Sequence, residues 1–360
     1  AQGVGILLGP GLNINRNSLC GRNFEYFSED PYLTGKMAAG YVRGIQSKGV
    51  SACPKHFAVN NQETLRMVSD SIVDERTLRE IYLTGFEIVL GESNPRCIMT
   101  AYNKVNGAYA NENRHLLQDI LRGEWGYRGV VVTDWGGSND HALGVKLGST
   151  LEMPAPGGDS VRELVKAVKN GRVSEVDINA RLEELLDLIK SASSALQKAP
   201  KTIDWEAHHN LARKAAAESM VLLKNRGGIL PLDPDQSVAI IGDFAQTPRY
   251  QGAGSSLVNA PQVENFRQVF ERSGIHCAGY AQGFERNGHP NAALQEEAVE
   301  LAKGADVVLL FLGLDEVQES EGLDRRHMKL AQTQINLLMA LHRANPQIVV
   351  VLASGSAVET

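Results

Sequence analysis

The stretch Gly129-Val130-Val131-Val132-Thr133-Asp134-Trp135-Gly136-Gly137 decides how the rest of the chain is interpreted. Three consecutive β-branched apolar residues after a glycine are typical of a fully buried strand. The strand ends at an acid, an indole and two glycines. Parallel α/β proteins place their chemistry at the carboxyl ends of strands, but an isolated Asp there suits a turn or a helix cap equally well. Taken alone, the stretch leaves both interpretations of Asp134 open.

The first half of the chain repeats this pattern of strand, polar loop and helix. We expect strands at 4–8, 49–53, 97–100, 129–132 and 150–153, and helices at 31–46, from 74 onward and at 116–125. Such a repeat predicts parallel strands joined by helical crossovers. Polar side chains follow the strands in succession, namely Arg22, Lys55, His56, Tyr102 and Asp134. In a (β/α) barrel these positions converge on one rim, which favours a catalytic role for Asp134.

The second half predicts a further α/β domain after a connecting segment. Two structural helices come first, and the second begins at a capping box, Ser174 to Asp177. Residues 191–203 are small, polar and basic, so we interpret them as a linker between domains 1–190 and 204–360. A helix is predicted from Asp204 through Leu223. Partly parallel strands are then predicted at 237–242, 305–312 and 347–352, with helices at 298–303 and 330–342.

Composition restricts the class of protein. The 360 residues are 43% hydrophobic and 22% charged, as in ordinary globular proteins. A net charge of −6 and the lack of any dense Lys/Arg run argue against a nucleic-acid partner. No apolar run approaches the roughly 18 residues that span a bilayer, so no membrane partner is expected. The four cysteines are widely spaced, which predicts free thiols and neither a disulfide framework nor a zinc site.

Two motifs in the second half bear on the chemistry of the protein. Gly252-Ala253-Gly254 opens like a dinucleotide loop but lacks the third glycine, which disfavours nucleotide binding. An acidic run from Asp315 to Arg326 follows the predicted strand that ends at Leu312. Hydrolysis of a glycosidic bond needs one ionised and one protonated carboxyl group, and this run offers a partner for Asp134. An ordinary solvated acidic loop is the competing interpretation.

Several ordered motifs resemble glycoside hydrolase family 3, most closely its two-domain β-glucosidases. They are Gly9-Pro10-Gly11, Gly21-Arg22-Asn23-Phe24-Glu25-Tyr26-Phe27-Ser28-Glu29-Asp30-Pro31, Lys55-His56-Phe57, Met99-Thr100-Ala101-Tyr102-Asn103, Thr133-Asp134-Trp135 and Glu321-Gly322-Leu323-Asp324-Arg325. The resemblance covers nearly the whole chain. The family's single-domain N-acetylglucosaminidases place Pro-Gly-His-Gly after Lys-His-Phe, whereas this chain continues Ala58-Val59-Asn60.

The resemblance implies a fold and a set of site residues. The fold is α/β, with a (β/α)8-type barrel followed by an α/β sandwich. Asp134 would be the nucleophile and Glu321 the general acid/base, with Glu319 as the second choice. The residues that would contact the sugar are Arg22, Lys55, His56, Met99, Tyr102, Trp135 and Ser255. We expect the charges of Lys55 and Arg22 to keep Asp134 ionised.

These roles imply a retaining β-glucosidase that releases terminal β-D-glucosyl residues from small β-glucosides or oligosaccharides through a covalent glycosyl-enzyme. No metal or organic cofactor is implied. A β-xylosidase, another β-glycosidase of the family, or a non-catalytic sugar-binding fragment are the other functions that the sequence leaves open. Calorimetry showing sugar binding without hydrolysis would distinguish the last of these.

The ends of the chain differ from the family pattern. Family members begin upstream of Gly3, with early barrel strands that include a sugar-binding Asp, and they continue past Thr360. We therefore expect an N-terminally incomplete barrel and a C-terminally incomplete sandwich. Localisation stays open between the cytoplasm, the periplasm and secretion, and the oligomeric state is undetermined, with a homodimer as one option.

Overall fold

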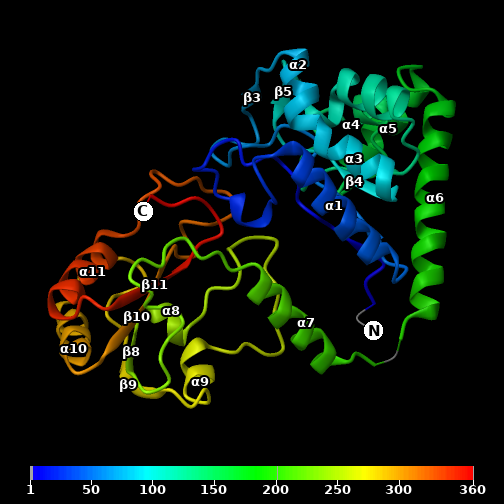
Figure 1. The fold of residues 1–360 in the computed structure, drawn as a ribbon. Helices are drawn as coiled ribbons and strands as arrows, with labels where there is room; N and C mark the ends of the chain where they lie inside the picture. Colours follow the sequence, from blue (N-terminus) through cyan, green and yellow to red (C-terminus); the bar gives the residue numbers. More distant parts are fainter. Residues whose placement is uncertain (1–2, 201, 360) are drawn as a thin grey trace. The chain divides into compact units, whose positions relative to one another are not determined.

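A computed structural model describes residues 3–200 and 202–359, in two compact units that divide between Ile203 and Asp204 (Figure 1). Both units combine helices with parallel strands. The predicted two-domain α/β architecture is therefore confirmed. The elements of the first unit are β1 Ile6–Leu7, η1 Asn23–Glu25, α1 Pro31–Gln46, β2 Ser51–Ala52, β3 Asp70–Ser71, α2 Glu75–Thr77, η2 Leu78–Leu83, α3 Thr84–Ser93, β4 Cys97–Met99, β5 Lys104–Val105, β6 Ala108–Tyr109, η3 Ala110–Glu112, η4 His115–Glu124, β7 Val130–Val132, α4 His141–Leu147, α5 Asp159–Lys169 and α6 Glu175–Lys198.

The parallel strands of the first unit lie in sequence order. Strand β1 pairs with β2, and β4 pairs with β7. A parallel bridge from Phe57 to Thr100 links β2 to β4, and another from Val132 to Leu151 continues beyond β7. The strand predicted at 150–153 is reduced to that bridge at Leu151. A small separate sheet, β3-β5-β6, lies outside this series and was not predicted.

Both faces of these strands are buried, and alternate residues supply two cores. Ala52, Ile98 and Val131 face a large cluster that includes side chains of α1, α3 and η4. Their neighbours face a second cluster that includes Leu188 of α6; it contains Cys53, Cys97, Met99, Val130 and Val132. Burial on both faces explains why Val130-Val131-Val132 is continuously apolar and not alternating. All four cysteines are free thiols, as predicted.

The second unit contains a four-stranded parallel sheet in the order β11-β10-β8-β9. Right-handed crossovers then require α10 and α11 to cover one face and α9 the other, which agrees with Figure 1. The strand order reverses between β8 and β10, where open α/β sheets bind ligands. The elements of this unit are α7 Trp205–Glu218, β8 Ser237–Ile241, α8 Asp243–Gln246, α9 Phe266–Phe270, β9 His276–Ala281, α10 Ala292–Lys303, β10 Val307–Gly313, α11 Gln332–Ala344 and β11 Ile348–Ala353.

Several predicted boundaries are wrong, including the start of α10, which lies at Ala292 and not at 298. Helix α6 begins at the expected capping box of Ser174 and Asp177, but it continues to Lys198, so most of the predicted linker is helical. Small and basic residues such as Ala and Lys favour helices as readily as they occur in linkers. Helix α7 begins after Asp204, as predicted, but ends at Glu218 and not at Leu223. Across the described residues, no helix is both long enough and apolar enough to cross a membrane.

Arg122 gives a test of how the first unit is held together. Its guanidinium donates to the carbonyls of Tyr127 (3.1 Å), Gly129 (2.8 Å) and Gly148 (2.8 Å) and pairs with Glu184 of α6 at 3.0 Å. We expect Arg122→Ala to lower the free energy of unfolding by about 3–5 kcal/mol, because Glu184 and three carbonyls lose a buried partner. Arg114→Ala, at a side chain that is 72% exposed, should change it by less than about 0.5 kcal/mol. Equal urea midpoints for the two variants would contradict this account.

Candidate active site

Asp134 lies at the carboxyl end of β7, in the row where the parallel strands terminate. The backbone around it is fixed on both sides, because Thr100 N donates to Val132 O (2.9 Å) and Thr133 N donates to Leu151 O (3.0 Å). Its own carbonyl accepts from Gly137 N at 2.8 Å. The side chain is largely buried, and the residue is 8% exposed. The strand therefore holds this carboxylate rigidly at the rim of the unit.

Opposing effects set the ionisation of Asp134. Burial raises the pKa of its carboxyl group, whereas a hydrogen bond from the Tyr102 hydroxyl and the charges of Arg22, Lys55 and Arg66 lower it. Desolvation is the largest of these effects, and the pKa lies above its usual value. The expectation that Lys55 and Arg22 favour the ionised form is right in sign. Their charges offset only part of the cost of burial.

Four of the predicted sugar-contacting residues act on Asp134, namely Tyr102 through its hydrogen bond and Arg22, Lys55 and His56 through charge or proximity. Arg22 is 1% exposed, and its Nε donates to Glu25 Oε1 at 2.5 Å. Lys55 forms a parallel bridge with Gly11, and its amide donates to Pro10 O at 2.9 Å. His56 follows directly and is 1% exposed.

His56 is held by contacts on both sides of its ring. Its Nε2 lies 3.4 Å from Asp134 Oδ2, and its Nδ1 lies 3.3 Å from the Tyr26 hydroxyl and 3.2 Å from Asn13 Oδ1. The Asn13 amide also exchanges hydrogen bonds with the His56 backbone, at 2.8 Å and 2.9 Å. Burial, followed by the charge of Arg22, lowers the pKa of His56 well below its usual value. A neutral imidazole therefore faces the carboxylate at neutral pH and adds no positive charge beside it.

Arg66 is a site residue that the sequence analysis missed. Its guanidinium lies 4.7 Å from the centre of the Tyr102 ring, and its charge lowers the pKa of Asp134. The fully buried carboxylate of Glu63 accepts from Arg66 Nη1 at 2.6 Å. No strand runs into this segment, so a search of strand ends does not reach it. The polar run that continues from Lys55-His56-Phe57 was the available signal.

The two predicted apolar contacts differ in exposure. Trp135 is 39% exposed, so part of its indole is available to a ligand. Met99 is 2% exposed and packs in the core cluster with Cys53, Cys97 and Val132.

The second unit carries the other predicted carboxylates on the loop after β10. Glu321 is half-buried, and its Oε2 accepts from Ser255 N at 2.7 Å. The backbone amide of Ser255, a predicted sugar contact, donates to this carboxylate. Ala253 pairs with Ser320 in a parallel bridge, so the two loops run side by side. Glu319 is 1% exposed, and its oxygens accept from surrounding donors.

Gly254 fits closely against Glu321. It has a φ of +125°, and a Cβ at this position would lie 2.4 Å from the Glu321 Cβ and 2.9 Å from its Oε2. Only glycine combines this backbone conformation with that approach. The glycine-rich segment, first considered as a nucleotide loop, therefore serves to hold an acidic side chain.

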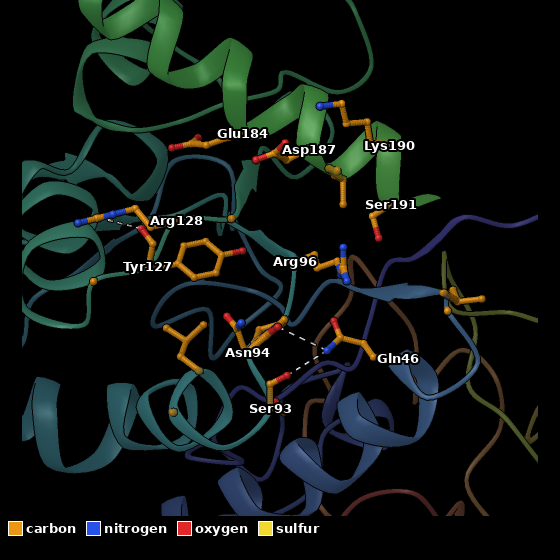
Figure 2. A pocket seen from close by; sticks show the side chains of 18 of the residues that line it. Gln46, Ser93, Asn94, Arg96, Tyr127, Arg128, Glu184, Asp187, Lys190 and Ser191 are labelled. Carbon is orange, nitrogen blue, oxygen red and sulfur yellow. Dashed lines mark hydrogen bonds between the residues drawn. The ribbon is translucent and has the colours of Figure 1, made fainter. Parts of the chain in front are cut away.

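A hollow of the first unit lies away from Asp134. It has a volume of about 1440 Å³ and is lined by Arg96, Arg128, Glu184 and Asp187, among other residues (Figure 2). Segments 93–96 and 126–129, which contribute to it, precede β4 and β7. The cavity therefore lies at the amino ends of the strands, whereas Asp134 lies at a carboxyl end. In the part of the chain that is described, no three His, Cys, Asp or Glu side chains are grouped to hold a metal ion.

Comparison with known proteins identifies the family. Residues 1–188 match the Glycosyl hydrolase family 3 N terminal domain, and residues 220–360 match the Glycosyl hydrolase family 3 C-terminal domain. The chain belongs to glycoside hydrolase family 3. The resemblance found in the sequence motifs is thus confirmed.

Relatives of the family 3 chain include enzymes named for different activities. It is 47% identical to "Thermostable beta-glucosidase B" of Acetivibrio thermocellus, over 100% of this chain and 48% of that protein. It is 44% identical to "Exo-alpha-(1->6)-L-arabinopyranosidase" of Bifidobacterium breve, over 99% of this chain and 48% of that protein. The crystal structure of the Bifidobacterium adolescentis GH3 beta-glucosidase matches with a TM-score of 0.94 and 44% identity, covering 99% of this chain and 52% of that one. The chain thus spans about half the length of these relatives.

The electrostatic balance at Asp134 can be tested directly. Lys55→Met should raise the pKa of the Asp134 carboxyl group further above its ordinary value, because one of the charges that lower it is removed. A ¹³C NMR titration of that carboxyl carbon measures the change. Lys169→Met removes an exposed lysine at the end of α5 and serves as the control. An unchanged or lowered Asp134 pKa in Lys55→Met would refute the balance.

Gly254→Ala tests the contact with Glu321. The added methyl group must displace the Glu321 side chain, so the Ser255 amide should lose its acceptor and exchange with solvent about 10-fold faster or more. Gly322→Ala is the matched control, because Gly322 also has a positive φ (+86°) but meets no atom within 4 Å of its added Cβ. Both variants carry a backbone strain of about 1–2 kcal/mol. Faster exchange at Ser255 in both variants alike would assign the effect to strain and not to the contact.

Proposed function

We propose that this family 3 protein is a retaining β-glucosidase that hydrolyses terminal β-D-glucosyl residues by double displacement. The observation that carries the proposal is the buried carboxylate of Asp134 at a strand end, bordered by Arg22, Lys55, Arg66, His56 and Tyr102. The expected substrates are small β-glucosides or oligosaccharides.

Asp134 suits the role of nucleophile. A nucleophilic carboxylate must be ionised and poorly solvated, so that it attacks the anomeric carbon without first losing a hydration shell. Burial supplies the second condition, and the three cations together with the Tyr102 hydroxyl support the first. Neutral His56 and the cationic side chains can also donate hydrogen bonds to sugar hydroxyls.

Glu321 suits the role of acid/base. It is half-buried on the loop after β10, next to the reversal of strand order where open α/β sheets bind ligands. The contact from Ser255 N orients the carboxyl group. In the first step a protonated Glu321 would protonate the leaving oxygen, and in the second it would activate water for attack on the glycosyl-enzyme.

We also propose that the parallel strands of the first unit belong to a (β/α)8-type barrel and that the sheet of the second unit belongs to an α/β sandwich. Support comes from the consecutive order β1, β2, β4, β7 and Leu151 and from burial of both strand faces. Barrel strands interior to a ring of helices have these properties.

An α-L-arabinopyranosidase is the second candidate, supported by the 44% identity to the Bifidobacterium breve protein. The anomeric geometry of an α-L-arabinopyranoside matches that of a β-D-galactoside without its hydroxymethyl group. The same nucleophile and acid would therefore serve either sugar, and the choice depends on contacts around the ring.

Replacement of Asp134 tests the mechanism. Asp134→Ala should reduce kcat on a nitrophenyl β-glucoside by at least about 1000-fold, and added azide should yield the α-glucosyl azide by attack from the vacated face. Asp187→Ala, on the exposed part of α6, should retain full activity. The rates of the wild-type protein on nitrophenyl β-glucoside, β-xyloside, β-galactoside and α-L-arabinopyranoside are compared to establish which sugar it prefers. Full turnover by Asp134→Ala would remove Asp134 from the nucleophile's role.

A further inference from the structure

The carboxylate of Glu319 lies two residues before Glu321 and is enclosed by donors. Glu319 Oε2 pairs with Arg249 Nη1, and both side chains are almost completely buried, at 1% and 5% exposed. Gly355 N donates at 3.0 Å to Oε1 and at 3.1 Å to Oε2. The Ser356 hydroxyl donates to Oε1 at 2.5 Å. Both oxygens are thus occupied as acceptors, and the group has no open path to a sugar.

These contacts join three loops of the second unit. Arg249 follows β8 and α8, Glu319 follows β10, and Gly355 and Ser356 follow β11. All three loops leave the carboxyl edge of one parallel sheet, where neighbouring strands bring them together. A single buried carboxylate therefore fixes loops that lie far apart along the chain.

Ser356 extends the network to the far end of the acidic loop. Arg325 Nη1 donates to Ser356 Oγ at 3.0 Å and to Ala357 O at 2.5 Å. The Ser356 hydroxyl thus accepts from Arg325 while donating to Glu319. Burial lowers the pKa of Arg325, and the charge of Glu319 counteracts that effect. Both ends of the segment that carries Glu321 are consequently tied to residues 355–357.

The network reaches Glu321 through the backbone. Ala253 N donates to Glu319 O at 3.0 Å, and Glu321 N donates to Ala253 O at 2.9 Å. The amide of Ser255 then contacts the Glu321 carboxylate itself. Displacement of Glu319 would disturb the register between segments 253–255 and 319–321 and with it the direction of the Glu321 side chain.

We propose that Glu319 is the positioning residue for the acid/base: through Arg249, Gly355 and Ser356 it fixes the loop that presents Glu321. The proposal rests on the function proposed above, in which Glu321 exchanges the proton. It replaces the earlier second choice of Glu319 as the acid/base itself, because a carboxylate enclosed by a guanidinium, an amide and a hydroxyl accepts hydrogen bonds and does not donate a proton to substrate.

The experiment compares Glu319→Ala and Glu319→Gln with Glu321→Ala in the full chain, using nitrophenyl and dinitrophenyl β-glucosides. Glu319→Ala should lower kcat by about 100-fold, the typical effect of a 1 Å misplacement, with a smaller change in KM. It should keep the basic limb of the pH profile, because Glu321 still titrates there. Azide should not restore its turnover. Glu321→Ala should lose the basic limb, and azide should give the β-glucosyl azide from the dinitrophenyl substrate.

Two further measurements separate positioning from general destabilisation. Glu319→Gln keeps the shape of the side chain but loses the charge that faces the buried Arg249, so it should lower the melting temperature and yet lose less kcat than Glu319→Ala. The Glu321 amide should exchange faster in Glu319→Ala, because its bond to Ala253 O is loosened. Glu316→Gln is the matched control: the side chain lies on the same loop, is 45% exposed and pairs with Arg286, and its replacement should change neither kcat nor amide exchange.

Three outcomes would overturn the proposal: azide rescue of Glu319→Ala, loss of its basic limb, or unchanged kcat with unchanged exchange at Glu321. The first two would make Glu319 the proton donor. Other results would show that the proposed function itself is wrong. Wild-type protein inactive on every glycoside, or Glu321→Ala with an intact pH profile, would refute that function, while amide exchange at Glu321 would still decide whether Glu319 fixes the loop.

Discussion

The desolvation of one carboxylate is the constraint on which the candidate site depends. Asp134 is buried at a strand end, and burial raises its pKa more than its neighbours lower it. The surrounding polar side chains follow from this cost, since a buried anion requires compensating charge and hydrogen bonds. Arg22, Lys55, Arg66 and Tyr102 supply them. In the function proposed above, the same groups would bind the hydroxyls of a sugar substrate.

The charged side chains around Asp134 are held in place by the strand ends and by local contacts. The cations and donors come from several strand ends and loops, and three of them are fixed locally: Arg22 by Glu25, Arg66 by Glu63 and His56 by Asn13. Like charges are therefore held near one another by separate anionic or neutral partners and not by Asp134 alone. Such local anchoring keeps the site organised before any ligand binds.

The sequence predicted those helices and strands whose ends are set by neighbouring residues along the chain. The boundaries of α1 were predicted at both ends, because Pro31 occupies its first turn and Asp30 accepts from Tyr32 N at 2.8 Å as the cap. Strand β7 and the place of Asp134 at its end followed from an uninterrupted apolar run. Strand β9 was missed because Gly279 interrupts the apolar run that is typical of a buried strand. In the structure, the pairing of β8 with β9 also shifts register near Ala239. The helix was predicted through Leu223 because residues 220–223 are apolar, but it ends at Glu218 and these side chains are exposed. An apolar run alone does not show whether a neighbouring surface will cover it.

The site itself shows where sequence spacing reaches its limit. A strand-end rule finds Lys55, His56, Tyr102 and Asp134, because backbone topology alone brings them together. It cannot find Arg66, whose place depends on a loop that folds back over the Tyr102 ring. Nor can it rank Glu319 against Glu321, which are two residues apart on one acidic loop. Tertiary contacts separate them: Glu319 is enclosed by Arg249, Gly355 and Ser356, whereas Glu321 stays half-buried against Gly254. Burial and hydrogen-bond donors thus give two carboxylates of one loop different environments, as the roles proposed for them, acid for Glu321 and anchor for Glu319, require.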